Sequence, residues 1–162
     1  MLNKSFKTFV EHFSYIRFLI KTSKQSLMSN NEQNRRVGML FMRLLLGIIF
    51  LMQGYGKIFS IGVTDLYSSF FTDYESSLPV WLLQFTAYYT SYAELIAGGL
   101  LVIGLFRNFA LYILGSVLLI VSFGHGFMMP IWDLQHVLFR AILLIPLLLL
   151  PEEWDTWQLQ NW

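Results

Sequence analysis

Long apolar stretches separated by short polar turns dominate the sequence after residue 36. Four of these stretches, 37–59, 79–106, 109–129 and 134–150, have the length of a membrane-spanning helix, because about 20 residues cross a hydrocarbon core roughly 30 Å thick. The turns at Arg107 and Pro130 are short, so consecutive helices are expected to run antiparallel. The pattern therefore predicts an all-α fold, an integral membrane four-helix bundle.

The segment before the first apolar stretch follows a different pattern. Apolar side chains recur at helical spacing from Phe6 to Ile20, with charged side chains around them, which predicts an amphipathic helix at the membrane surface. A loosely ordered basic leader is the alternative. The polar run 22–34 is expected to be a linker. Residues 1–36 then form a cytoplasmic leader, 37–150 the transmembrane domain, and 151–162 a short acidic cytoplasmic tail.

Composition supports the membrane assignment and excludes several chemistries. Hydrophobic residues make up 56 % of the chain and charged residues 13 %, about half the charged share of soluble domains. The net charge of +1 gives no basic surface for nucleic acid. Without cysteine, redox chemistry would need a bound molecule. The chain also lacks the phosphate-binding glycine loop, the nucleophile elbow and the zinc-hydrolase motif.

The distribution of basic residues predicts the orientation in the membrane. Seven of the eleven lysines and arginines precede the first apolar stretch, and Arg107 lies in the second turn. The first and third turns carry acidic side chains: Asp65, Asp73, Glu75 and Asp133. Because basic residues stay on the cytoplasmic side, both chain ends and the Arg107 turn are expected there.

Charged side chains inside the apolar stretches require partners, because each costs about 2.5 to 3.5 kcal/mol at the membrane centre. Arg43 lies in the first stretch and Glu94 in the second. Their depths lead us to predict an Arg43–Glu94 ion pair. Such a pair either fixes the helix register or belongs to a functional site, and the sequence favours neither reading. Small residues are expected to let the first two helices pack closely: Gly47, Gly54, Gly98 and Gly99.

Further polar side chains fall near the predicted outer ends of the spans. They are Gln53, Lys57, His125, His136 and Arg140. With Arg43 and Glu94 they form our candidate intramembrane polar site, and the outer ones are candidates to line one pocket. The two histidines invite a metal or haem interpretation, but no further ligand has a recognised spacing. We predict no metal site and favour a hydrogen bond between helices or an interfacial histidine.

Three segments resemble the pattern of the DoxX family of small bacterial membrane proteins. They are RLLLG at 43–47, QGYGK at 53–57 and AELIAGGLLVIGLFR at 93–107. The resemblance extends over about 37–150, and its matches fall on Arg43, Gly54, Lys57, Glu94, Gly98 and Gly99. It implies four transmembrane helices in a bacterial inner membrane. It also implies a link to quinones and to an oxidoreductase partner, because the family takes its name from a subunit of a terminal quinol oxidase or thiosulfate:quinone oxidoreductase.

Three functions are compatible with these observations. The first is a redox-associated subunit that binds a quinone or similar amphipathic ligand among Lys57, His125, His136 and Arg140, beside a partner oxidoreductase. The second is a membrane anchor or scaffold for a soluble enzyme. The third, ranked last, is a small transporter that uses Arg43, Glu94 and Arg140. Whether the chain is catalytic and whether it forms a homo-oligomer stay open.

Overall fold

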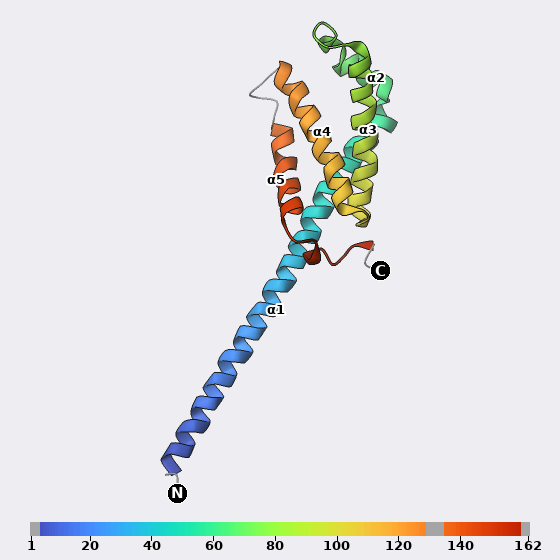
Figure 1. Ribbon diagram of the computed structural model, residues 1–162. Coiled ribbons are helices and arrows are strands. Elements are labelled where there is room, and N and C mark those ends of the chain that lie inside the picture. The colour runs from blue at the N-terminus through green and yellow to red at the C-terminus, as the bar shows by residue number, and fades with distance from the viewer. Residues whose placement is uncertain (1–3, 129–134, 160–162) are drawn as a thin grey trace. The chain divides into compact units, whose positions relative to one another are not determined.

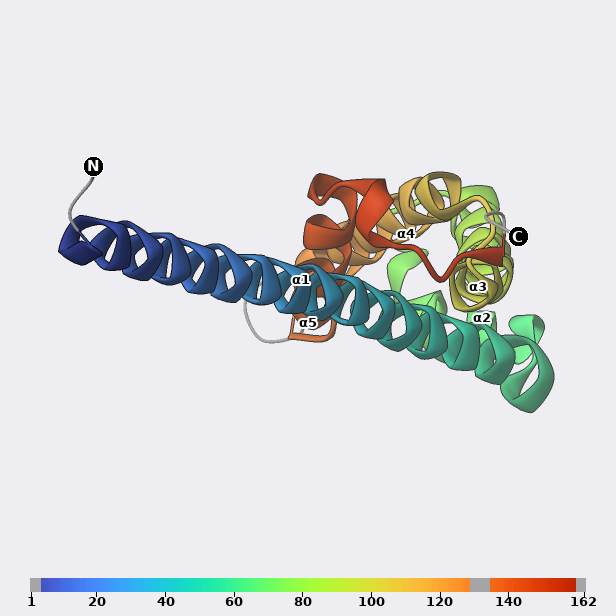
Figure 2. The same ribbon diagram turned by 90° about the horizontal axis from the view of Figure 1, so that it is seen from below.

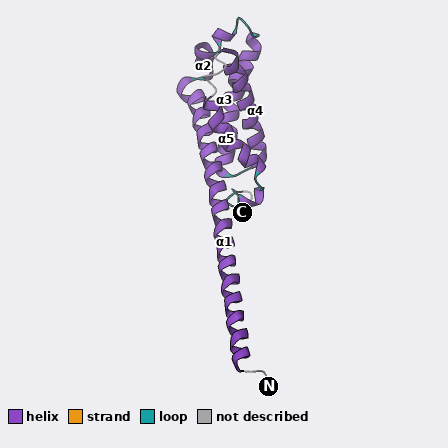
Figure 3. Ribbon diagram, turned by 90° about the vertical axis from the view of Figure 1, so that its left-hand side faces the viewer, coloured by secondary structure: helices purple, strands orange, loops and turns teal. Residues whose placement is uncertain are grey.

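The computed structural model describes residues 4–128 and 135–159, and every regular element in these ranges is a helix (Figure 3). The five α-helices are α1 (Lys4–Tyr55), α2 (Val63–Phe70), α3 (Val80–Ile103), α4 (Arg107–Met128) and α5 (Gln135–Leu149). Three short helices complete the chain: the π-helix η1 (Gly56–Ile61) and the 3-10 helices η2 (Thr72–Tyr74) and η3 (Glu152–Trp154). The predicted all-α class is confirmed.

The chain divides into two compact units, Met1–Gly38 and Met39–Trp162. The first unit consists of the N-terminal part of α1. Its run 22–34, which the sequence predicts to be a linker, is helical and continues α1 without a break. The sequence explains this, because no proline or glycine precedes Gly38 and nothing therefore stops the helix. The surface location of this helix stays a prediction.

Four helices of the second unit share one hydrophobic core. Helix α4 packs against both α3 and α5 (Figure 1), and α1 from Met39 onward adds side chains to the same core. The core side chains are Met39, Leu46 and Phe50 of α1, Ala97 and Leu101 of α3, Ala110, Leu111, Leu114, Val117 and Leu118 of α4, and Val137, Leu144 and Leu147 of α5. Large apolar side chains on the opposite faces of these helices remain exposed.

Helices α1 and α3 approach closely at three of the predicted glycines. A Cβ on Gly98 would lie 2.5 Å from the backbone nitrogen of Leu51 and 3.0 Å from the carbonyl oxygen of Gly47. A Cβ on Gly54 would collide with the backbone of Leu95. Gly99 is different, because its Cβ would make an ordinary 3.8 Å contact. The missing side chains thus set the spacing between the two helices.

The apolar helices agree in part with the four predicted spans. Two helical segments are long and apolar enough to cross a bilayer, Ser29–Ile61 and Arg107–Gly126, and α5 is a shorter apolar helix. Helix α3 ends at Ile103 because Gly104 adopts the left-handed conformation, with φ at +71°, which favours glycine. The predicted turn at Pro130 and Asp133 lies outside the described residues.

Candidate functional site

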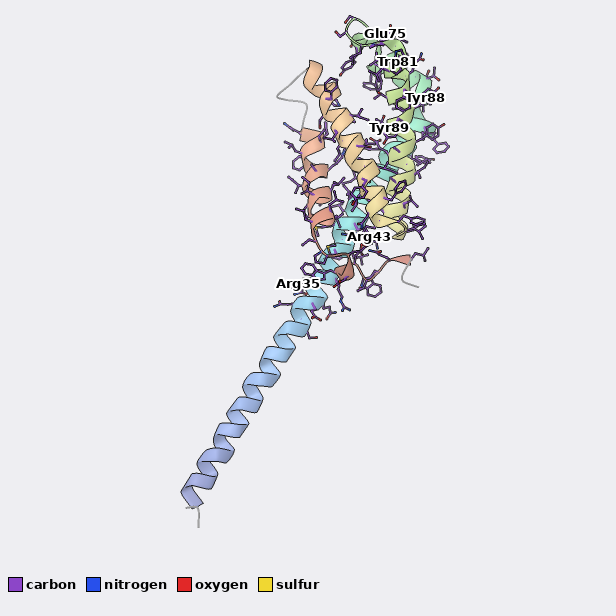
Figure 4. All side chains as sticks on the ribbon, in the orientation of Figure 1. Arg35, Arg43, Glu75, Trp81, Tyr88 and Tyr89 are labelled. Atoms are coloured by element: carbon purple, nitrogen blue, oxygen red, sulfur yellow. The ribbon has the colours of Figure 1, made fainter. Side chains whose placement is uncertain are left out.

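Arg43 forms the centre of a fully buried cluster at one end of the packed helices. Its Nε lies 3.0 Å from Oδ2 of Asp155, and its Nη1 donates to the carbonyl oxygens of Leu101 and Val102 in the last turn of α3. Its Nη2 donates to the carbonyl oxygen of Trp157 at 2.6 Å. In Figure 4, Arg43 lies near the end of the packed helices opposite to Glu75 and Trp81. Arg43 therefore caps α3 electrostatically and ties the C-terminal tail to it.

Arg107 completes this cluster from the first turn of α4. Its Nε lies 3.5 Å from Oδ2 of Asp155, and its Nη2 donates to the carbonyl oxygen of Leu147 in α5. Arg43, Arg107 and Asp155 are each 1 % exposed. These three residues are called the tail cluster below. One carboxylate and several helix-end carbonyls thus compensate two buried guanidinium groups.

The C-terminal tail was expected to be a simple acidic extension, but its residues 151–159 fold back onto the helices. After α5 it crosses the ends of α4 and α3 (Figure 2), and Asp155 and Gln158 become buried. Gly104 makes room for this contact, since a Cβ there would lie 2.8 Å from both Nη1 of Arg43 and Cα of Gln158. The sequence signal was the excess of arginine at the predicted inner end, which requires a nearby carboxylate.

The predicted Arg43–Glu94 ion pair is wrong. Arg43 pairs with Asp155, whereas Glu94 pairs with Lys57, whose Nζ lies 2.7 Å from Oε2 of Glu94. The prediction counted depth along straight helices and left the tail out. Because the tail brings a carboxylate to the end of α1, Arg43 has a partner at its own depth.

Glu94 and Lys57 form the core of a second charge cluster. Glu94 is 0 % exposed, whereas the side chain of Lys57 is 24 % exposed. Lys57 lies in η1, where the helix widens directly after Tyr55, and such π-turns often occur at functional sites. Oε2 of Glu94 is engaged by the ammonium group of Lys57, whereas the buried Oε1 has no hydrogen-bond donor among the described residues. The ion pair therefore leaves acceptor capacity unused in a buried position.

Arg140 of α5 joins the second cluster. Its guanidinium carbon lies 5.6 Å from the ring centroid of Phe50 in α1, and its charge interacts with that of Glu94. Lys57, Glu94 and Arg140 are called the π-helix cluster below. It brings together side chains from η1, α3 and α5.

The remaining predicted site residues are Gln53, His125 and His136. Gln53 is partly buried, and its Oε1 is buried without a hydrogen-bond donor. His125 is partly buried in the last turn of α4, and His136 is exposed at the start of α5. Within residues 4–128 and 135–159 no group of three or more metal-ligating side chains is found.

The fold and the comparisons together place the protein in a known family. An all-helical fold with two helices apolar and long enough to cross a bilayer indicates a membrane protein. The family model for DoxX matches residues 38–126, more than half of the chain, and the chain belongs to the DoxX family. The comparisons with curated proteins and with solved structures gave no match. The matched range includes Arg43, Lys57, Glu94 and Arg107 but ends before Arg140 and Asp155.

Proposed function

We propose that helices α1, α3, α4 and α5 span a bacterial inner membrane as a four-helix bundle. The exposed faces of α1 and α5 support this, because they carry large apolar side chains such as Phe41, Leu45, Phe139 and Ile142. The 24 residues of α3 measure about 36 Å and the 15 of α5 about 22 Å, a difference that a bilayer accommodates by tilt and local thinning. The basic N-terminal segment and Arg107 favour a cytoplasmic location for both chain ends.

Within this bundle we propose a binding site for the polar headgroup of a quinone-like ligand at the π-helix cluster. The observation that carries the proposal is the buried Glu94 carboxylate, whose Oε1 lacks a hydrogen-bond donor while its Oε2 contacts a partly exposed Lys57. Buried acceptors without donors are costly. A ligand that supplies hydroxyl groups would relieve this cost, so the cluster is suited to recognising a headgroup.

The side chains present fit both states of such a ligand. The carbonyl oxygens of an oxidised quinone accept hydrogen bonds, which Lys57 and Arg140 can donate. The hydroxyl groups of the reduced form donate hydrogen bonds, for which Oε1 of Glu94 and Oε1 of Gln53 offer free acceptors. The apolar helix faces would surround the isoprenoid tail. The chain has no cysteine, so electrons must pass to a partner oxidoreductase.

Ligand binding can be tested on the protein purified in mild detergent. We expect quinone to copurify with the full chain, and a short-chain quinone analogue to bind in a titration of intrinsic tryptophan fluorescence. The variant Lys57→Gln should bind the analogue at least about tenfold more weakly, a loss typical of one charged hydrogen bond. Glu152→Gln, on the exposed tail, serves as the matched control. Equal binding by Lys57→Gln and the unmodified chain would contradict the proposal.

A membrane anchor for a soluble enzyme is the second candidate. The fixed tail favours it, because Trp157 and Leu159 are each 57 % exposed although Asp155 and Gln158 beside them are buried. An ordered segment that presents apolar side chains is suited to contact a protein partner. The ligand-binding and anchor proposals differ in what copurifies with the chain. An anchor should copurify with a soluble protein and without quinone, and the variant Trp157→Ala should lose that soluble protein.

A further inference from the structure

Arg140 has unused binding capacity inside the helical unit. Its side chain is partly buried, and its guanidinium group is held over the ring of Phe50. Among the described residues it makes no hydrogen bond and no close ion pair, and it feels Glu94 only through a longer-range attraction. The contact with Phe50 is a cation–π interaction, which engages the face of the guanidinium group and leaves its five N–H donors free.

The charge balance of the π-helix cluster indicates what the free N–H groups of Arg140 bind. Lys57 and Arg140 carry two positive charges, and Glu94 carries one negative charge that is already in contact with Lys57 at 2.7 Å. The cluster therefore retains one uncompensated positive charge. An uncompensated charge at membrane depth is expensive unless it meets a counterion or reaches water. The tail cluster shows the alternative, because its two arginines bond to a carboxylate and to carbonyl oxygens.

We infer that Arg140 pairs with a negatively charged oxygen of the bound molecule, so that the site takes its amphipathic ligand as an anion. This inference rests on the proposed ligand site and specifies the charge of the headgroup. A planar guanidinium group with free N–H donors matches an oxyanion with two hydrogen bonds at once. Lys57 stays with Glu94, and Arg140 is the group that distinguishes an anionic headgroup from a neutral one.

Two sources can present such an oxygen to Arg140. One is an acidic hydroxyl of a quinone-like headgroup, and the other is the phosphate of a membrane lipid. Both place a negative oxygen at the boundary between polar and apolar surroundings. Arg140 itself lies in α5, outside the family-matched range 38–126.

The test compares two probes that differ in one methyl group. An alkylated 2-hydroxy-1,4-naphthoquinone is ionised at neutral pH, whereas its O-methyl ether stays neutral and has the same ring and tail. Both are titrated into the full-length protein in detergent, with Arg140→Gln, Arg140→Lys and the control Glu152→Gln alongside. Bound phospholipid is measured by mass spectrometry on the same samples. Thermal unfolding checks that each variant is folded, and Arg140→Lys keeps the charge if Arg140→Gln proves unstable.

The expected result is that the anionic probe binds at least about tenfold more tightly than its ether, since a charged hydrogen bond is involved. Arg140→Gln should abolish this preference, and Arg140→Lys should retain part of it. If both probes bind the unmodified chain and Arg140→Gln alike, the inference is overturned while the ligand site stands. If neither probe binds but an anionic phospholipid is retained and lost in Arg140→Gln, the anion is a lipid phosphate and the quinone proposal fails. If the protein binds no quinone probe and retains no anionic phospholipid, both the anion inference and the proposed ligand site are overturned.

Discussion

The tail cluster and the π-helix cluster contain the same charges, two cations and one carboxylate, but they differ in how completely these charges are paired. In the tail cluster every charged residue is 1 % exposed, and its two arginines share Asp155 and bond to three or more carbonyl oxygens. In the π-helix cluster Lys57 reaches the surface and Arg140 keeps free donors. Buried charges that bond to a counterion and to backbone carbonyl groups specify a structure, whereas a cation with free donors near the surface is available to a ligand.

The largest expected effect comes from removing the carboxylate of the tail cluster. Asp155→Asn leaves Arg43 and Arg107 buried without a counterion, and breaking a buried ion pair costs about 3 to 5 kcal/mol. We expect the free energy of unfolding in detergent to fall by that amount. Glu152→Gln is the matched control, because Glu152 is exposed and accepts from the exposed Asn108, a contact worth at most about 1 kcal/mol. Equal losses for the two variants would contradict a structural role for Asp155.

The second-largest expected effect comes from Gly98→Ala, a variant that changes the spacing of α1 and α3 without changing any charge. Gly98→Ala places a Cβ 2.5 Å from the backbone of Leu51, so α1 must move away from α3. Overpacking of this kind costs about 1 to 3 kcal/mol. Because Glu94 lies one helical turn before Gly98, the shift should also weaken the contact with Lys57 and reduce binding of a quinone analogue. Gly99→Ala is the neighbouring control, since its Cβ meets only a side chain at 3.8 Å. An unaffected Gly98→Ala protein would show that the helices are not held at this spacing.

A third variant tests the difference between the clusters directly. Glu94→Gln keeps the shape of the side chain but removes its charge, and Lys57 can be solvated because it is 24 % exposed. We therefore expect a free energy of unfolding within about 1 kcal/mol of the unmodified chain, well below the loss for Asp155→Asn. Binding of a quinone analogue should fall at least about tenfold. A Glu94→Gln protein that fails to fold would instead make Glu94 a structural residue like Asp155.

The local sequence pattern was sufficient to predict the parts of the fold that depend on helix geometry. The helical class followed from apolar stretches and short turns. Gly47 and Gly54 were recognised as packing residues because their spacing places them along one face of α1, and Gly98 because it lies on a similar stripe of α3; these faces are where α1 meets α3. The predicted span ran three residues past the helix end at Ile103, because apolar residues continue after the left-handed turn at Gly104.

The pairing of charges could not be predicted in the same way. Asp155 lies more than a hundred residues from Arg43, and its burial depends on how the tail turns after Pro151, which no periodic pattern encodes. Glu94 was a candidate site residue from the sequence, but its pairing with Lys57 involves the widened turn of η1. Depth along a straight helix therefore suggested the wrong partner. The sequence contains the charged residues of both clusters, but which residues pair depends on the three-dimensional path of the chain.

The smallest expected effect concerns a charged contact outside the packed helices, between Tyr67 of α2 and Glu75 at the end of η2. The Tyr67 hydroxyl donates a hydrogen bond to Oε1 of Glu75 at 2.7 Å, and this bond, more than any burial, raises the pKa of Tyr67 above its ordinary value of 10.0. A raised pKa in the folded state means that the stabilisation is fully present below the ordinary tyrosine pKa and is lost as the pH rises through the folded value.

We expect Glu75→Gln to lower the pKa of Tyr67, because the neutral amide no longer repels the tyrosinate and accepts a weaker hydrogen bond. The measurement is the tyrosinate absorbance during an alkaline titration, with Tyr67→Phe subtracted so that the other seven tyrosines cancel. Asp73→Asn is the control for a nearby negative charge without this bond. An identical titration for Glu75→Gln and the unmodified chain would show that the contact is absent in solution. Because the contact is exposed, unfolding at neutral pH should barely change, unlike that of Asp155→Asn.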